Sequence, residues 1–282
     1  MARPHSGILR MTAVDVHIGR RIFRIDSAKY FDLSVHIDGG VEGLSAFGVP
    51  PAGVQTVENA WFVGDTRRGG SCNVREYRFI PHCHGTHTEC VGHIVDQDVS
   101  VTAFLKDAWI PATLISVKPE KGMDCPESYI PGKAEGDALI TRRALVEKLR
   151  TLDDEDFHQV LVIRSLPNSP SKRTRQYLAT PYFSNEAMAE IVRRGVKHLL
   201  VDMPSVDRME DEGKLSNHRL FWELPPDAHD LNRCKAPFRT ITELIFVGDD
   251  IRDGYYLLNL QIAPFRGDAA PSRPLIFPVE VP

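Results

Sequence analysis

The chain has 282 residues, of which 42% are hydrophobic and 26% charged, with a formal net charge of -4 at pH 7. This composition is typical of a soluble globular protein with room for one large domain or two small ones. A weakly negative chain without a basic stripe argues against a nucleic-acid partner. No apolar run approaches the roughly 18 residues that span a bilayer, so no membrane partner is expected either.

The N-terminal stretch and the cysteines bear on the compartment. Residues 1–14 contain no apolar segment of the kind found in secretory signals. The cysteines are odd in number and form no Cys-x-x-Cys pair, which favours a reducing cytoplasm over a disulfide framework. They are Cys72, Cys83, Cys90, Cys125 and Cys234.

The first part of the chain predicts strands and loops. Residues 12–25 alternate between apolar and polar around Gly19, which indicates a hairpin. Residues 31–37 alternate with a period of two and predict a half-buried strand, closed by a turn at 38–40. Residues 41–70 are rich in glycine and predict long loops around an apolar patch near Trp61. A short half-buried strand is expected at 77–80.

The second part predicts helices alternating with buried strands. Apolar runs at 112–117, 160–163 and 199–202 are typical of buried strands. Thr141 is a candidate N-cap for a helix through Leu152, and Ser184 or Asn185 for a helix over 186–194 that ends before Gly195. Residues 118–136 form an excursion, and the chain closes with strands at 241–247, 255–262 and 275–279. A mixed α/β fold with a β-α-β crossover follows.

The densest chemistry of the sequence lies between Pro81 and His93. Four of the eleven histidines fall here, with two cysteines and one carboxylate. These side chains are ligands of zinc and its first-row neighbours. In an extended strand, side chains two apart share a face, so Cys83, His87 and Glu89 would point one way and could bind one cation. His82 and His84 would point the other way unless a bulge changes the phase.

Other interpretations of this segment remain open from the residues alone. It could be a polar strand end without a metal. Cys90 is expected to be a packed core thiol rather than a ligand. A nucleophilic Cys83 or Cys90 beside a histidine is a further alternative, although nothing in the sequence marks its oxyanion hole.

The segment 85–93, Gly-Thr-His-Thr-Glu-Cys-Val-Gly-His, resembles the His-x-Gly-Thr-His-x-Asp-x-Pro-x-His signature of the cyclase family. This family of metal-dependent hydrolases includes kynurenine formamidase and isatin hydrolase. Two further segments, Asp-Leu-Ser at 32–34 and Val-Asp-Met-Pro-Ser-Val-Asp at 201–207, are similar to family segments. The resemblance implies a swivelling β/β/α fold, with a mixed sheet and packed helices. It implies a single domain over 1–282, in which 1–30 could be an N-terminal extension.

The chain departs from the family signature at several positions. Cys83 stands in strict register with the first His, and His82 or His84 could take its place after a one-residue bulge. Glu89 replaces the Asp and Val91 the Pro. The family's later His and Glu ligands correspond to His218 and Glu243, with Glu223 as a competitor for the second.

The resemblance also implies a chemistry. His87, Glu89 and Cys83 (or a neighbouring His) would hold one metal, and His218 with Glu243 would hold a second or complete the first. Zinc is favoured and manganese is the alternative. A divalent metal lowers the pKa of water to about 7, and the hydroxide so formed would attack an amide or lactam carbonyl. His93 would move the proton to the leaving nitrogen.

The sequence therefore predicts a hydrolase of a small amide, formamide or cyclic amide that forms a homo-oligomer. The alternative is a non-catalytic metal-binding protein of the same fold. Three aspartates are assigned outside the ligand set: Asp202 and Asp207 are expected to fix the turn around Pro204, and Asp32 lies either near the site or in solvent. The aromatic residues Phe47 and Trp61 could line a substrate pocket or belong to the core.

Overall fold

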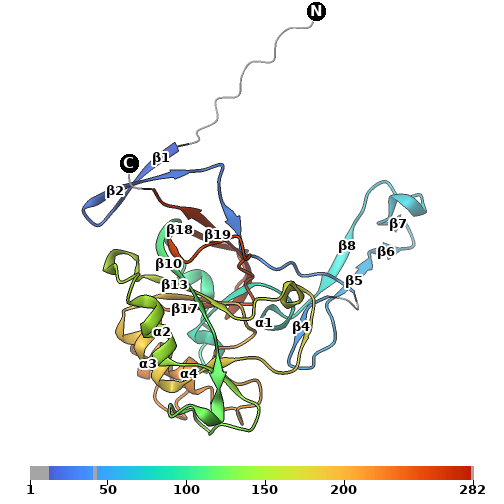
Figure 1. Cartoon of the computed structure of the whole chain (residues 1–282). Coiled ribbons are helices and arrows are strands. Elements are labelled where there is room, and N and C mark those ends of the chain that lie inside the picture. The colour runs from blue at the N-terminus through green and yellow to red at the C-terminus, as the bar shows by residue number, and fades with distance from the viewer. Residues whose placement is uncertain (1–12, 41–42, 281–282) are drawn as a thin grey trace, which may run out of the picture.

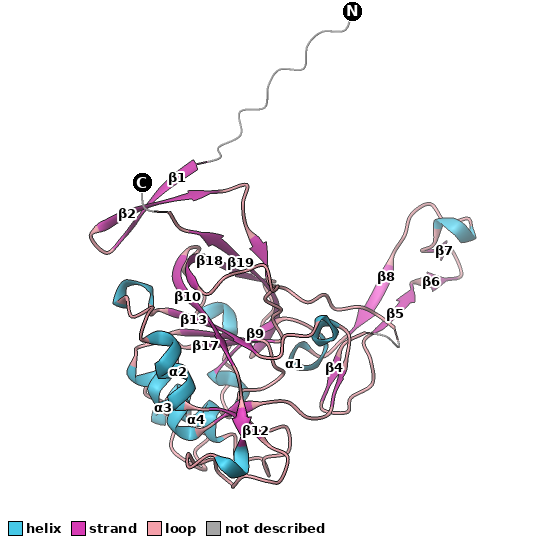
Figure 2. Ribbon diagram, viewed as in Figure 1, coloured by secondary structure: helices cyan, strands magenta, loops and turns pink. Residues whose placement is uncertain are grey.

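A closed barrel of seven strands forms the centre of the computed structural model, which describes residues 13–40 and 43–280. Hydrogen-bonded neighbours follow in the order β18, β10, β13, β16, β17, β9 and β19, and β18 pairs with β19 to close the ring. Figures 1 and 2 show β10, β13 and β17 of this barrel next to the helices. The short β3 (Phe31–Asp32) also pairs with β19. The barrel strands are β9 (His87–Cys90), β10 (Ile110–Val117), β13 (Val160–Ser165), β16 (His198–Val201), β17 (Thr240–Glu243), β18 (Gly254–Ile262) and β19 (Ala269–Pro278). The mixed α/β fold predicted from the sequence is confirmed.

The four strands β10, β13, β16 and β17 run parallel to one another and are buried on both faces. One face packs on helices α2 (Arg142–Leu149) and α3 (Asn185–Arg193) through residues such as Ile115 and Ile163. The alternate residues, such as Leu114 and Val162, belong to a second core cluster with β18 and β19. Burial of both faces explains the continuous apolar runs of β13 and β16.

Both predicted helix caps are confirmed. The Thr141 hydroxyl accepts a hydrogen bond from the Ala144 N–H at the start of α2, and the Ser184 hydroxyl accepts one from Ala187 at the start of α3. Gly195 follows α3 with φ +77°, the left-handed conformation that glycine adopts most readily. Helix α2 ends at Leu149, earlier than the expected Leu152.

The N-terminal part differs more from expectation. The hairpin is present as β1 (Ala13–Ile18) and β2 (Arg21–Asp26), and only residue 12 of the predicted range lies outside the described residues. The strand expected over 31–37 is limited to β3, because the chain turns away after Asp32, whose carboxylate accepts hydrogen bonds from Ser34.

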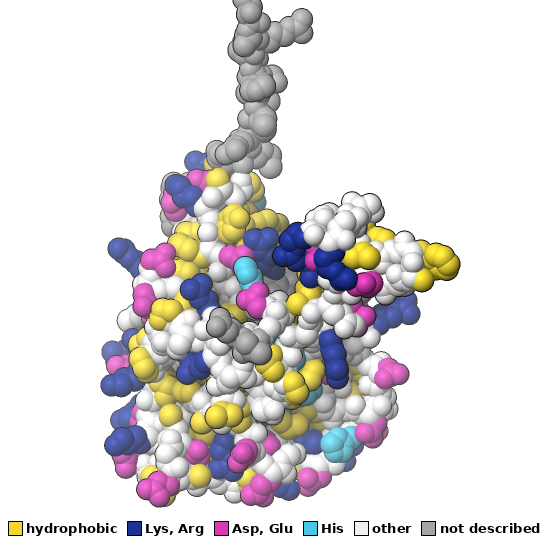
Figure 3. Space-filling model, turned by 90° about the vertical axis from the view of Figure 1, so that its right-hand side faces the viewer, with side chains coloured by type: hydrophobic (Ala, Val, Ile, Leu, Met, Phe, Trp, Pro, Cys, Tyr) yellow, Lys and Arg dark blue, Asp and Glu magenta, His cyan; other side chains and the backbone are white. Residues whose placement is uncertain are grey.

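Residues 53–78 form an arm of paired strands that projects from the barrel (Figure 1). Trp61 is 93% exposed and Phe47, just before the arm, is 42% exposed, so neither side chain belongs to the core. The strand predicted at 77–80 is also not half-buried, because Tyr77 lies on the arm in β8 (Arg75–Arg78) and is 61% exposed. Figure 3, which views the molecule from the arm's side, shows apolar and basic side chains next to one another on this face.

The remaining strands are short and lie outside the barrel. They are β4 (Ser45–Ala46), β5 (Gly53–Thr56), β6 (Glu58–Asn59), β7 (Phe62–Val63), β11 (Glu120–Lys121), β12 (Ala138–Ile140), β14 (Gln176–Tyr177) and β15 (Tyr182–Phe183). Two further helices, α1 (Pro81–His84) and α4 (Ser216–Trp222), contribute to the site described below. Among the described residues, no helix has the length and apolar character needed to cross a membrane.

Candidate metal centre

Strand β9 places His87 and Glu89 on one face, as the period of two predicts. The neighbouring strand β17 runs antiparallel to it, and Glu243 lies opposite His87 in the register. Nε2 of His87 is 3.5 Å from Oε2 of Glu243, and ligand atoms of His87, Glu89 and Glu243 lie within 4.8 Å of one another. All three side chains are almost completely buried.

The residues before β9 form a helical turn rather than a strand. Pro81 occupies the first turn of α1, where its fixed φ is compatible with a helix and no N–H is required. Gly85 then brings the chain close to the neighbouring segment: a Cβ there would lie 2.7 Å from Cγ1 of Ile37 and 2.9 Å from the Val35 carbonyl oxygen. This turn changes the side-chain phase, and Nδ1 of His82 lies 3.0 Å from Oε2 of Glu89.

The three candidates for the first ligand are separated by their contacts. His84 uses both ring nitrogens for the backbone, because Nδ1 accepts from the Ile80 N–H and Nε2 donates to the Pro50 carbonyl. Cys83 is buried and belongs to neither set of potential ligands found among the described residues, contrary to the sequence-based prediction. Only His82 directs a ring nitrogen at the site, because α1 replaces the extended strand on which the prediction for Cys83 depended.

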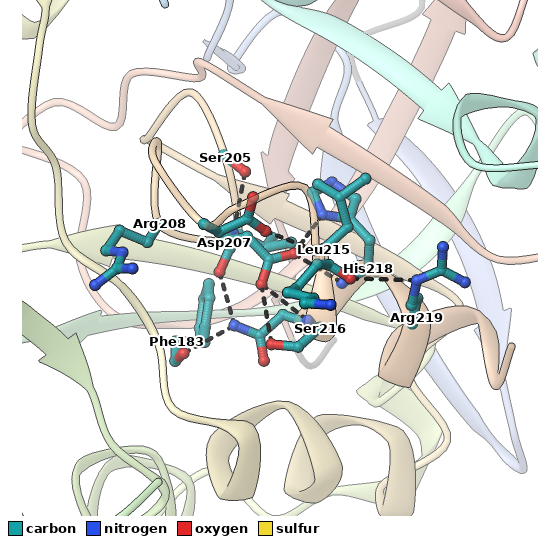
Figure 4. Close-up of polar contacts among 12 residues, drawn as sticks. Phe183, Ser205, Asp207, Arg208, Leu215, Ser216, His218 and Arg219 are labelled. Atoms are coloured by element: carbon teal, nitrogen blue, oxygen red, sulfur yellow. Dashed lines mark hydrogen bonds and ion pairs between the residues drawn. The ribbon is translucent and has the colours of Figure 1, made fainter. Parts of the chain in front are cut away.

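Helix α4 contributes His218, whose position depends on Asp207 (Figure 4). Oδ2 of Asp207 accepts a hydrogen bond from Nδ1 of His218 at 2.6 Å and another from its backbone N–H. Nε2 of His218 then lies 3.1 Å from Oε1 of Glu89 and 3.9 Å from Oε1 of Glu243. Asp207, expected only to fix a turn, therefore orients a predicted ligand.

The histidines His87, His218 and His82 share one arrangement. In each, one ring nitrogen donates a hydrogen bond to a fixed acceptor. The acceptor is the Gly85 carbonyl for His87 (3.0 Å), Asp207 for His218 (2.6 Å) and Asp268 for His82 (2.9 Å). The other nitrogen of each faces Glu89 or Glu243. An acceptor on the outer nitrogen and an inner nitrogen facing carboxylates is the usual environment of metal-binding histidines.

The buried Nε2 of His87 has no hydrogen-bond partner, and Oε2 of Glu89 has only the ion-pair contact with Nδ1 of His82 at 3.0 Å. The two carboxylates also interact unfavourably. Burial raises the pKa of Glu243, and the negative charge of Glu89 raises it further. Burial opposes ionisation of Glu89, but His93, His218 and His82 outweigh it and hold its pKa well below the usual range. A cation would satisfy the unpartnered Nε2 of His87 and offset the carboxylate repulsion, so the residues fit a divalent metal.

A second set of potential ligands comprises His82, Glu89 and His93. The rings of His82 and His93 are stacked with centroids 4.3 Å apart, and Oδ2 of Asp268 lies 3.4 Å from Nδ1 of His93. Burial lowers the pKa of His82, but hydrogen bonds to Asp268 and Glu89 outweigh it and raise that pKa to about 10. Asp268 and Gly92 border a cleft of about 650 Å³ beside His93.

Several other residues singled out from the sequence lie away from this group. Glu223 is 38% exposed and paired with Arg239, so Glu243 is the acidic residue that joins the cluster. Asp202 is paired with the buried Lys172 at 2.8 Å and accepts from the Ser165 N–H, so its contacts lie outside the turn around Pro204 that it was expected to fix. Asp32 is partly exposed and paired with Arg273.

Neither cysteine of the segment has the character of a nucleophile. Burial and then the negative charge of Glu243 raise the pKa of Cys83 to about 11. Burial raises the pKa of Cys90 to about 12, and Cys90 packs in a core cluster with Val101 and Ala270, as predicted. Both side chains are therefore thiols rather than thiolates at neutral pH.

Comparison with known proteins gives one family and one fold. The Cyclase family model, described as "Putative cyclase", matches residues 31–208. None of the curated proteins searched matches the chain. Solved structures that are similar over most of the chain include a metal-dependent hydrolase and two isatin hydrolases. A predicted metal-dependent hydrolase from Bacillus stearothermophilus has 16% identity and a TM-score of 0.56, covering 88% of this chain and 98% of that one.

The other two structures are isatin hydrolases. Isatin hydrolase A from Labrenzia aggregata has 13% identity and a TM-score of 0.60, covering 89% of this chain and 94% of that one. Isatin hydrolase A from Ralstonia solanacearum has 14% identity and a TM-score of 0.55, covering 88% and 91%. At these low identities the comparison shows a shared fold and does not assign an activity to this chain.

Proposed function

The chain belongs to the cyclase family, and from this premise we propose that it is a metal-dependent hydrolase of a small amide, formamide or cyclic amide. One observation carries the proposal: three histidines, each held by an acceptor at its outer nitrogen, direct their inner nitrogens at two buried glutamates. The names of the isatin hydrolases of similar fold support a cyclic amide as one substrate class.

The metal would be held by His87, Glu89 and Glu243, with His218 and His82 completing the set. His82 takes the place that the family signature gives to its first His. When bound, a divalent metal such as zinc supplies Lewis-acid chemistry, because it polarises a carbonyl and lowers the pKa of water to about 7. Asp207 and the Gly85 carbonyl accept hydrogen bonds from Nδ1 of His218 and His87, which leaves Nε2 of each ring as the nitrogen that would bind the metal.

His93 is proposed to handle the proton of the reaction. It is 30% exposed at the side chain and lies next to Gly92, which lines the cleft. Its Nδ1 faces Asp268, so Nε2 is the atom that would carry the proton. The oxygen of a water would join the carbonyl carbon, and Nε2 of His93 would take one proton of that water. As the C–N bond breaks, Nε2 would pass this proton to the leaving nitrogen.

The proposal is tested by metal analysis of the purified protein followed by a screen of formamides and lactams. We expect a bound divalent metal and hydrolysis that stops after chelation and resumes when zinc or manganese is returned. Metal binding without hydrolysis of any compound would favour the non-catalytic metal-binding protein. Hydrolysis that survives complete removal of the metal would contradict the proposal.

A further inference from the structure

The acceptor that holds His82 is Asp268, the residue before β19, and no part of the family signature contains it. Oδ2 of Asp268 lies 2.9 Å from Nε2 of His82 and 3.4 Å from Nδ1 of His93. One carboxylate oxygen therefore contacts two stacked imidazoles, one beside Glu89 and the other beside the cleft.

The backbone fixes Asp268 in this place. Ala269, the next residue, lies opposite Glu89 in the register of β19 and β9. The Cys90 N–H donates to the Asp268 carbonyl at 2.9 Å, and the Val101 N–H donates to the Gly267 carbonyl at 2.9 Å. The position of the carboxylate is thus tied to the strand that carries two of the proposed ligands.

We propose that Asp268 is a positioning residue of the metal centre, which accepts a hydrogen bond from Nε2–H of His82 and so keeps Nδ1 turned toward Glu89. This inference rests on the proposed function, because it assumes that a metal binds among these residues. With the Nε2 proton held by Asp268, Nδ1, which lies 3.0 Å from Oε2 of Glu89, is the nitrogen that would lose its proton and offer a lone pair when a metal binds. Asp268 thus orients the ring of His82 through one ring nitrogen, as Asp207 orients the ring of His218.

The contact with His82 distinguishes Asp268 from Asp98, another acidic residue that lines the cleft. Asp98 lines the same cleft, but no hydrogen bond or ion pair joins its side chain to a histidine among the described residues. Asp98 therefore offers a matched control, because it shares the cleft's charge without the contact to His82.

The experiment measures the zinc affinity of the metal-free protein by competition with a chelating dye. For Asp268→Asn we expect an affinity about 10- to 100-fold weaker than that of the wild type, the usual effect of removing an outer carboxylate. Asp268→Glu should recover part of the loss, because its carboxylate can still reach His82. Asp98→Asn should bind zinc like the wild type, and thermal unfolding of each metal-free variant reports whether the fold is kept.

A double-mutant cycle separates positioning from general charge. His82→Ala should itself weaken zinc binding, and adding Asp268→Asn to it should cause no further loss. An unchanged affinity of Asp268→Asn, or the full loss persisting in the His82→Ala background, would overturn the inference and leave the proposed function standing. A wild-type protein that binds no zinc or manganese would instead overturn both.

Discussion

At His87 the two ring nitrogens have different partners, and this difference explains why the residue suits a metal. Nδ1 must donate to the Gly85 carbonyl, which can only accept, so the buried Nε2 of the neutral ring carries a lone pair without a hydrogen-bond partner. A lone pair in this position costs free energy unless a cation or a proton meets it.

We predict that His87→Ala and Glu89→Ala each abolish metal retention and hydrolysis. Each change removes one of the three buried side chains whose ligand atoms lie within 4.8 Å of one another. Metal content by elemental analysis and hydrolysis of the best compound from the screen are the two measurements. Cys83→Ala is the control and should keep the metal, because Cys83 lies outside both ligand sets of the described residues. Full activity in metal-free His87→Ala protein would end the account.

His93→Ala is predicted to keep the metal and to lose rate. Removal of a positioned proton donor costs about 10²- to 10⁴-fold in rate, whereas the buried ligands His87, Glu89 and Glu243 remain in place. Steady-state kinetics together with metal analysis check this prediction. Loss of the metal in this variant would reassign His93 as a ligand, as its place in the second ligand set allows.

The sequence predicts the site best where the ligands follow one another along a strand. The period of two along a strand predicts that His87 and Glu89 share a face, and the structure confirms this in β9. The sequence pattern does not predict which of Cys83 and His82 faces the site, because Pro81 begins a helical turn that the pattern alone does not reveal. Asp268 could not be predicted, because it lies 186 residues from His82 in the chain and only the barrel brings it there.

At the scale of the element, α2 is the clearest test of how local sequence determines structure. The Thr141 hydroxyl accepts from the Ala144 N–H at 3.1 Å and donates to Oε1 of Glu120 at 2.7 Å. Thr141→Ala should lower the free energy of unfolding by about 1 kcal/mol, since the helix loses its N-cap. Thr141→Ser keeps the hydroxyl and should lose much less. Urea denaturation of the metal-free proteins measures both, and equal stability of the two variants would contradict the assigned cap.

The elements that the sequence predicts well are those with a strong local signal. Caps, buried apolar runs and Gly195 mark α2, α3, β10, β13 and β16 correctly. The arm was not predicted, because glycine-rich residues 41–70 indicate turns without showing that the strands pair only with one another. Trp61 at its exposed end shows that an aromatic residue in such a stretch need not belong to the core.

At the scale of the whole molecule, burial of a neutral histidine in the barrel makes stability depend on pH. Burial, with a smaller effect of Lys197, lowers the pKa of His198 to about 4. Its Nδ1 lies 2.8 Å from the Thr240 hydroxyl, which joins β16 to β17. Between pH 6.5 and 4 the unfolded chain binds a proton at this residue and the folded protein does not.

We therefore predict that the free energy of unfolding falls through this window, by up to about 3 kcal/mol from His198 alone. His198→Asn removes the titrating group and keeps a polar side chain near Thr240. The difference in unfolding free energy between wild type and variant should shrink by that amount as the pH falls from 7 to 4. A difference that stays constant over this range would show that His198 is not buried in its neutral form.

Closure of the barrel is also a property of the whole molecule, and it brings β9, β17 and β19 together at the site. The strand order could not be derived from the pattern of apolar residues, because that pattern gives the strands and not their neighbours. The expected homo-oligomer stays a prediction.

The most direct measurement is an anomalous-scattering map from crystals of the zinc-loaded protein. The account predicts a strong peak among Nε2 of His87 and the carboxylates of Glu89 and Glu243. Zinc-loaded crystals that show no peak among these three side chains would contradict the claim that they hold the metal.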